Sequence, residues 1–159
     1  MALRNSHIAI LLLLLAAACS RPGGDYYFVS AETARENGGA YRFSFVPDKE
    51  DNYTTTLAAR VIRSRIAADS LEFDIHITPP AGEAVIERQA FPLLASEGVT
   101  IRLGAGSVTD YEWPWHEIAT EGYPGGEWTL SIAPSDPALA EAIYGIGFSY
   151  ERKIWEKEN

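Results

Sequence analysis

The sequence predicts an all-β protein: an antiparallel β-sandwich, jelly-roll or immunoglobulin-like, of about seven or eight strands with one short helix. Apolar and polar residues alternate along several segments, which is the period of a half-buried strand. Turns rich in glycine and proline separate these segments at a spacing of roughly 10–15 residues, as in all-β sandwiches. Only one short segment has a helical pattern. These observations favour a single sandwich domain behind an N-terminal lipoprotein signal peptide.

The N-terminal segment is predicted to be a signal rather than part of the fold. Arg4 precedes an uncharged apolar run, residues 8–18, which is too short for a membrane helix of about 20 residues. Small residues at 16–18 lead directly into Cys19, the single cysteine of the chain. A basic start, a short apolar run and small residues form a secretory signal. This signal resembles a bacterial lipobox, although an ordinary cleaved signal with an incidental cysteine is an alternative.

The lipobox resemblance implies where the mature protein is located in the cell. Its cysteine would be acylated, with palmitate among the acyl chains, so Cys19 would attach the domain to a membrane. Ser20 follows the cysteine, which by resemblance to lipoprotein sorting favours the outer membrane and its periplasmic face. We therefore expect a signal peptide at 1–18, an acylated cysteine and flexible tether at 19–24, and the β-sandwich at 25–155.

The composition excludes several functional classes. The chain has 13 Lys+Arg against 22 Asp+Glu, a formal charge of −9, and no basic cluster, which excludes a nucleic-acid partner. One cysteine excludes an internal disulfide and a cysteine-based zinc site. Removing residues 1–18 takes away one arginine, so the mature chain has 13 − 1 = 12 basic and 22 acidic residues, a charge of −10. Attachment to the membrane would therefore come from lipid rather than from charge.

The clearest strand is Ser70–Ile77. Its residues Leu71, Phe73, Ile75 and Ile77 fall on one face, and the turn at 79–82 ends it with two prolines and a glycine. Similar patterns predict strands at 41–45, 53–66, 99–103, 128–132 and 144–152.

Two further details follow from the C-terminal third. In the last strand Tyr144 is expected inward together with Ile146, Phe148 and Tyr150, and glycines at 145 and 147 are expected outward, where a neighbouring aromatic ring or a ligand would cover them. The helix is predicted at Asp136–Ala142, with Ser135 as its cap and a proline in its first turn.

A metal site has one candidate position. Glu72, Asp74 and His76 alternate along one strand face, where same-face neighbours lie about 7 Å apart, and ligands at that spacing can share a metal ion. A solvated outer sheet face is the simpler explanation, because polar residues alternate there by default. We expect no cofactor and no metal, and Asp74 and His76 are the residues that would hold a metal if one were bound.

Acid–base chemistry has a second candidate cluster. Acidic residues and a histidine gather in one aromatic segment, at Asp110, Glu112, His116, Glu117 and Glu121. The motifs Gly-x-Ser-x-Gly and His-Glu-x-x-His, which mark esterases and zinc hydrolases, are absent from the sequence. The sequence therefore predicts a protein that is not an enzyme and has no catalytic residue. A periplasmic hydrolase is the least favoured of the three functions that we consider.

The aromatic residues of 108–125 are the leading candidates for contacts with a partner. Tyr111, Trp113, Trp115 and Tyr123 are crowded into a segment bounded by proline and glycine. Exposed aromatic side chains on a loop stack on sugar rings or fill partner pockets. Trp113 and Trp115 are two residues apart, so both indoles can instead lie on one side and close one end of the sandwich, with at least one of them in the core.

The chain also resembles a known family over most of residues 19–152. The resemblance rests on Cys19, the aromatic segment 26–29, Tyr41–Phe45 with its acidic loop, the strand 53–66 running into 71–75, and the ends Gly126–Ile132 and Ile143–Glu151. These segments in this order resemble the GldH family of gliding-motility lipoproteins. The resemblance implies an outer-membrane-anchored periplasmic sandwich that acts without catalysis in the gliding and secretion apparatus, and it assigns a role only to Cys19.

The sequence therefore predicts a lipoprotein that contacts envelope proteins through an aromatic loop at 108–125 and an exposed sheet edge. The alternative is a carbohydrate-binding lipoprotein that uses exposed tryptophan or tyrosine side chains as stacking surfaces. The two differ in partner, and the expected attachment to the membrane through Cys19 is common to both.

Overall fold

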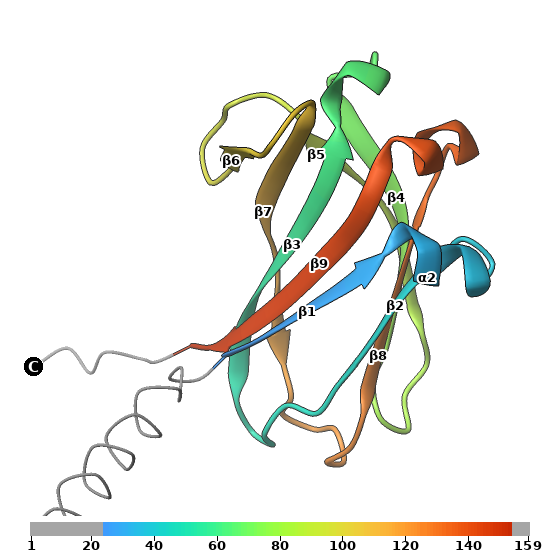
Figure 1. Ribbon diagram of the computed structural model, residues 1–159. Helices are drawn as coiled ribbons and strands as arrows, with labels where there is room; N and C mark the ends of the chain where they lie inside the picture. The colour runs from blue at the N-terminus through green and yellow to red at the C-terminus, as the bar shows by residue number, and fades with distance from the viewer. Residues whose placement is uncertain (1–23, 154–159) are drawn as a thin grey trace, which may run out of the picture.

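The computed structural model describes residues 24–153, and the nine strands in this range form one antiparallel β-sandwich (Figure 1). The predicted all-β sandwich is therefore confirmed, with slightly more strands than expected. The strands are β1 (Gly24–Ser30), β2 (Tyr41–Phe45), β3 (Asn52–Ile62), β4 (Ser70–Thr78), β5 (Val85–Pro92), β6 (Thr100–Leu103), β7 (Val108–Ala119), β8 (Trp128–Pro134) and β9 (Ile143–Arg152). Within residues 24–153, no helix has the length and apolarity needed to cross a membrane.

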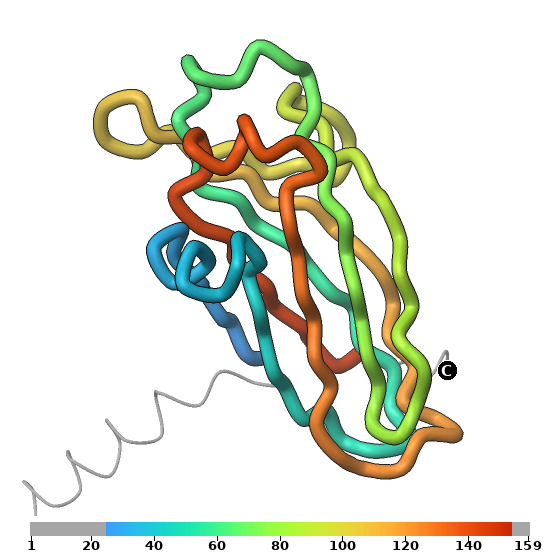
Figure 2. The backbone as a smooth tube through the Cα atoms, turned by 90° about the vertical axis from the view of Figure 1, so that its right-hand side faces the viewer, coloured from blue at the N-terminus to red at the C-terminus, as the bar shows by residue number. Residues whose placement is uncertain are grey.

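The strand order identifies the sandwich as a jelly roll rather than an immunoglobulin-like fold. One sheet has the order β1-β9-β3-β7-β6 and the other β2-β8-β4-β5, and Figure 2 shows the four strands of the second sheet side by side. The pairs β4–β5, β3–β7, β2–β8 and β1–β9 are nested along the chain, as in one long hairpin whose strands alternate between the sheets. Because β1 pairs with β9, Gly24 lies opposite Glu151 and the described ends of the chain lie together (Figure 1).

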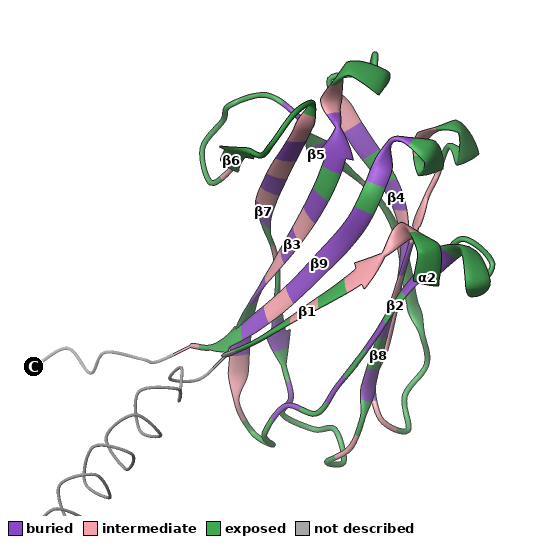
Figure 3. Cartoon of the chain, in the orientation of Figure 1, coloured by how far each residue is buried: buried purple, intermediate pink, exposed green. Residues whose placement is uncertain are grey.

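The core fills the space between the two sheets, where alternate residues of the strands are buried (Figure 3). Leu71, Phe73 and Ile75 of β4 are all buried, as their alternation predicts. Phe148 of β9 is fully buried, and its ring centroid lies 4.9 Å from that of Phe45. The period-two pattern of the sequence therefore places the apolar faces correctly in the central strands.

The α-helix α2 (Ala31–Glu36) has no counterpart among the sequence predictions. It follows β1 directly, and the hydroxyl of Ser30 accepts a hydrogen bond from the backbone N–H of Thr33, which caps its first turn. The helix has only 6 residues, so its apolar pattern is too short to recognise by periodicity.

The predicted helix at Asp136–Ala142 is a 3₁₀-helix, η2 (Pro137–Glu141). Its cap is Asp136 rather than Ser135, because the Asp136 carboxylate accepts the backbone N–H of Ala138 at 2.9 Å. A carboxylate next to the proline of the first turn is a better placed acceptor than the hydroxyl one residue earlier. A second 3₁₀-helix, η1 (Arg63–Arg65), ends the long strand that was expected to run to residue 66.

The last strand contains a β-bulge that reverses one predicted orientation. Arg60 pairs with Gly145 while Val61 pairs with Ile143, so Tyr144 is an extra residue on β9. Tyr144 is consequently exposed, and its predicted inward position is wrong. Beyond the bulge the predicted inward residues are buried: Ile146, Phe148 and Tyr150.

Candidate functional site

The aromatic segment at 108–125 is mostly a strand, and two of its four candidate residues belong to the core. Tyr111 and Trp113 on β7 are each only 3 % exposed, and their rings stack at 5.7 Å. The expectation of an aromatic loop is wrong, and neither side chain is accessible to a partner. Trp115 is half-buried, and Tyr123 is exposed in the turn after β7.

Two tryptophans of β7 join the two sheets. The indole N–H of Trp113 donates to the carbonyl oxygen of Pro92 at 2.7 Å, and Pro92 ends β5 in the opposite sheet. The indole N–H of Trp115 lies 3.0 Å from a side-chain oxygen of Glu87 and 3.0 Å from one of Gln89, both on β5. Both indoles therefore point toward β5, as expected if they lie on one side, and Trp113 is the one that belongs to the core.

A bulge in β7 directs two consecutive side chains toward β5. The pairing of β3 with β7 shifts between Thr54 and Thr56. The Thr55 hydroxyl donates to the carbonyl oxygen of His116 at 2.6 Å and accepts the backbone N–H of the same residue at 3.1 Å. An extra residue in a strand changes the direction of the side chains around it. His116 consequently joins Trp115 at the carboxylate of Glu87, with a His116 Nε2–Glu87 Oε2 distance of 3.0 Å.

These contacts border a shallow hollow of about 240 Å³ at the open side of the sandwich, which we name the β5-edge recess. The rings of Tyr123 and Trp128 meet edge to face at 5.0 Å on one side of it. β5 is the last strand of its sheet, and it begins with Val85 and Ile86, which are 56 % and 66 % exposed. The residues that line the recess are Ile77, Val85, Glu87, Trp115, His116, Glu117, Ile118, Ala119, Tyr123 and Trp128. The recess therefore unites the two accessible aromatic candidates with an exposed sheet edge.

The candidate metal ligands lie on the outer face of the four-stranded sheet. Asp74 is held by Arg88 through two hydrogen bonds of 2.7 and 3.2 Å, and these bonds lower the pKa of its carboxyl group. His76 is exposed and lies opposite Ile86 of β5. Within residues 24–153, no group of three or more histidine, cysteine or acidic side chains is arranged to hold a metal ion.

The candidate acid–base residues are dispersed along β7 rather than gathered at one point. Each of the four residues on β7 meets a different partner: Asp110 binds Arg60, Glu112 binds Arg102, His116 binds Glu87 and Glu117 binds Lys153. Two hydrogen bonds from Arg60 lower the pKa of Asp110, so this carboxylate is ionised at neutral pH. A general acid needs the opposite change, a raised pKa that keeps its carboxyl group protonated near neutral pH.

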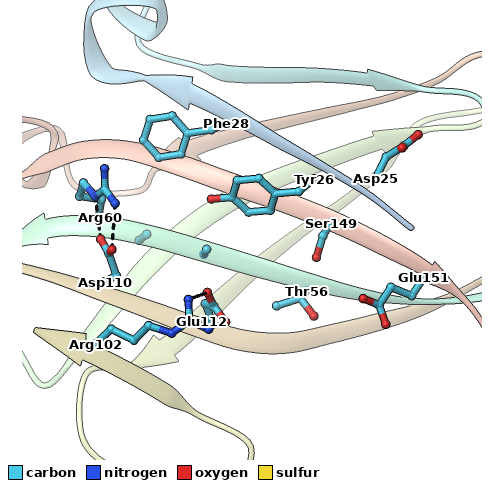
Figure 4. A pocket seen from close by; sticks show the side chains of 12 residues that line it. Asp25, Tyr26, Phe28, Thr56, Arg60, Arg102, Asp110, Glu112, Ser149 and Glu151 are labelled. Atoms are coloured by element: carbon cyan, nitrogen blue, oxygen red, sulfur yellow. Dashed lines mark hydrogen bonds and ion pairs between the residues drawn. The ribbon is translucent and has the colours of Figure 1, made fainter. Parts of the chain in front are cut away.

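Sequence reasoning missed a second hollow, of about 750 Å³, on the outer face of the five-stranded sheet. We name it the outer-face groove, and Figure 4 shows its lining. Tyr26 and Phe28 of β1 project onto this face and are 54 % and 44 % exposed. They lie over the glycines of β9: a Cβ atom at Gly147 would lie 2.5 Å from the Tyr26 hydroxyl oxygen, and one at Gly145 would overlap the Phe28 ring. The prediction that a neighbouring aromatic covers these glycines is confirmed.

The opposite side of the groove is charged. Arg60 Nε lies 2.8 Å from Asp110 Oδ1, and Arg102 Nη1 lies 2.8 Å from Glu112 Oε1. The Arg60 guanidinium also lies over the Phe28 ring at 5.7 Å from its centroid, so the aromatic and charged sides are in contact. Partial burial, followed by the charge of Glu112, raises the pKa of Tyr26, and its hydroxyl therefore remains a hydrogen-bond donor at neutral pH.

The groove brings together residues that are far apart in sequence. In the register of the sheet, Ser30, Gly145, Arg60, Asp110 and Arg102 form one row across five strands. The available sequence signal was the pair of alternating patterns Tyr-x-Phe at 26–28 and Gly-x-Gly at 145–147. Neither pattern identifies its partner strand, so sequence alone could not place them together.

The predicted lipidation site, Cys19, lies outside the described residues, as do residues 154–155 at the end of the predicted domain. No family model matches the chain, and no curated protein has a matching sequence. The resemblance to the GldH family and the attachment to the outer membrane therefore remain predictions.

Proposed function

We propose that this protein is a non-enzymatic outer-membrane lipoprotein that faces the periplasm and binds another envelope protein at the open edge of β5. The acyl chains on Cys19 would hold it on the membrane, and the β5-edge recess would receive an apolar side chain of the partner. By its resemblance to the GldH family, the partner belongs to the gliding and secretion apparatus.

The observation that carries the proposal is the exposed edge of β5. An edge strand offers backbone N–H and C=O groups to an extended segment of another chain, and adjacent pockets select its side chains. β5 pairs with β4 on one side, and among the described residues no strand covers its other side. Val85 and Ile86 stand exposed where β5 begins: Val85 lines the recess with its aromatic wall, whereas Ile86 lies on the outer face of the sheet opposite His76. An apolar extended segment therefore fits this edge better than a charged one.

Binding without catalysis is also supported by the electrostatics of the surface. Asp74 and Asp110 each receive two hydrogen bonds from an arginine, which lower the pKa of both carboxyl groups. Carboxylates held in this way act as fixed charges and ion-pair partners rather than as proton donors.

A short link to the anchor would keep the sandwich close to the membrane. Cys19 precedes Gly24, the first residue of β1, by five positions, a distance of at most about 18 Å when fully extended. Acyl chains contribute about 0.8 kcal/mol per buried methylene, and two chains give stable attachment. We expect Cys19→Ala to move the full-length protein from the membrane to the soluble fraction and to abolish incorporation of labelled palmitate. Full membrane retention of this variant would contradict the anchor.

Site-specific photocrosslinking in intact cells tests the partner surface. A photoreactive residue at Ile86 should crosslink to one envelope protein, and Val85→Asp should reduce that product by about tenfold, because an unpaired carboxylate would be buried in the interface. Leu103 on β6 is the matched control position, since it is an exposed apolar residue, 87 % exposed, on an edge strand of the other sheet. Equal yields of crosslinked product from Ile86 and Leu103 would contradict the proposal, as would a yield at Ile86 that Val85→Asp leaves unchanged.

A further inference from the structure

We infer that the outer-face groove binds a neutral oligosaccharide, at a site separate from the β5-edge recess. The two surfaces belong to different sheets: the groove is lined from β1, β9, β3, β7 and β6, whereas β5 ends the other sheet. The groove's volume of about 750 Å³ lies within the range of about 300–1,000 Å³ of small-ligand sites.

The aromatic side of the groove supplies stacking surfaces. Tyr26 and Phe28 are consecutive outward residues of β1, and their rings lean over β9, where glycines leave room for them (Figure 4). The rings keep large exposed surfaces, and such surfaces stack well on the apolar C–H faces of sugar rings. The close fit to Gly145 and Gly147 limits the freedom of the rings, which lowers the entropy lost when a ligand binds.

The charged side of the groove supplies paired donors and acceptors. A guanidinium has five N–H donors, and Asp110 takes two of those on Arg60, which leaves three for a ligand. Each carboxylate oxygen in the pairs Arg60–Asp110 and Arg102–Glu112 can accept a further bond. Adjacent sugar hydroxyls each donate and accept, so a fixed donor next to a fixed acceptor matches them.

The charge balance of the groove selects a neutral ligand. Among its lining residues, the Asp25 carboxylate accepts hydrogen bonds from the hydroxyls of Tyr27 and Tyr150 on the other face of β1. The charged side chains that face the groove are therefore two arginines against three acidic residues, a formal charge of 2 − 3 = −1, and the acidic residues are Asp110, Glu112 and Glu151. A polyanion would be repelled, so phosphate-rich or uronic-acid ligands are disfavoured.

The position of the groove within the sheet disfavours an extended peptide. The strands beneath its centre, β9, β3 and β7, are paired on both sides, so their backbone groups are already satisfied within the sheet. A peptide there would find no strand edge to extend. A sugar needs no such edge, because its hydroxyls are recognised by side chains: Thr56 and Ser149 lie on the same face beside the ion pairs (Figure 4).

Saturation-transfer NMR on the full-length protein, in a detergent without a sugar headgroup, tests this inference. The probes are cellotetraose, mannotetraose, maltotetraose and chitotetraose, with tetragalacturonate as the anionic comparison. We expect at least one neutral tetrasaccharide to bind, Phe28→Leu to weaken it by about tenfold through loss of the aromatic face, and Arg60→Lys to weaken it similarly through loss of the planar donor fork. Tyr144→Leu, which changes an exposed aromatic of β9 outside the groove, should leave binding unchanged.

Three results would overturn the inference. The first is no saturation transfer to any neutral probe while circular dichroism shows a folded protein. The second is binding that Phe28→Leu and Arg60→Lys leave at the wild-type affinity, or a tighter complex with tetragalacturonate. The third is crosslinking of an envelope protein by a photoreactive residue placed at Tyr26, with a yield that the neutral probes do not reduce. None of these results depends on crosslinking at Ile86, so the protein-binding proposal succeeds or fails separately.

Discussion

The hydrogen bond between Trp113 and Pro92 should be one of the main connections between the two sheets. Trp113 on β7 is 3 % exposed, and its indole N–H donates across the sandwich to the end of β5 at 2.7 Å. Trp113→Phe removes this bond, at a cost of about 1 kcal/mol, and leaves a small cavity that adds about 1 kcal/mol. We expect a total loss of about 2 kcal/mol for Trp113→Phe, and about 3–5 kcal/mol for Trp113→Ala.

The matched control is Trp115→Phe on the same strand. Trp115 is half-buried, and its acceptors on Glu87 and Gln89 can turn to solvent when the indole N–H is lost. The expected loss is therefore below about 1 kcal/mol. Urea unfolding of the full-length variants, followed by far-UV circular dichroism, measures the difference without relying on tryptophan fluorescence. If Trp113→Phe costs no more than Trp115→Phe, Trp113 does not join the sheets as we describe.

Three further predictions test the fold. Phe148→Ala, at a side chain with no exposed surface, should cost about 3–5 kcal/mol in urea unfolding, whereas Tyr144→Ala at the exposed bulge should cost below about 0.5 kcal/mol. Burial raises the pKa of Tyr41 to about 12, so the folded chain keeps a proton that the unfolded chain releases near pH 10. The contribution of Tyr41 to the free energy of unfolding should be fully present below pH 10 and fall by up to about 3 kcal/mol by pH 12, and Tyr41→Phe should remove this contribution from the pH profile. Gly145→Ala should lower the thermal midpoint, because its Cβ would lie 2.8 Å from the carbonyl oxygen of Val29, which cannot move without disturbing β1.

The strand pattern was predictable where one face of a strand is buried without interruption. In β4, strict alternation identified both the strand and its inward residues. Tyr111 and Trp113 also alternate with polar residues, but Pro114 favoured a loop, and the bulge opposite Thr55 accommodates this segment within β7. Tyr144 was misplaced for a related reason, since one inserted residue changes which face its neighbours occupy. Bulges depend on pairing with another strand, so a single strand's sequence does not reveal them.

The two candidate surfaces differ in how much of each could be predicted from the sequence. The β5-edge recess was partly predictable, because Trp115 and Tyr123 are close in sequence and stand near turn residues. The outer-face groove was not, because Phe28, Arg60 and Asp110 meet only through the register of β1, β9, β3 and β7. Sequence reasoning can name residues capable of an interaction, but contacts between distant strands require the topology of the sheet.

The predicted anchor is connected directly to the strand that lines the groove, and not to the sheet that contains β5. Tyr26 lies two residues into β1, so the link that would hold the protein to the membrane runs directly into the aromatic side of the groove. β5 is in the other sheet and shares no strand with the groove. A ligand in the groove and a partner at β5 therefore have no residue in common, and their binding energies should add rather than compete. Saturating neutral tetrasaccharide should leave crosslinking at Ile86 unchanged, and competition between them would mean that one ligand covers both surfaces.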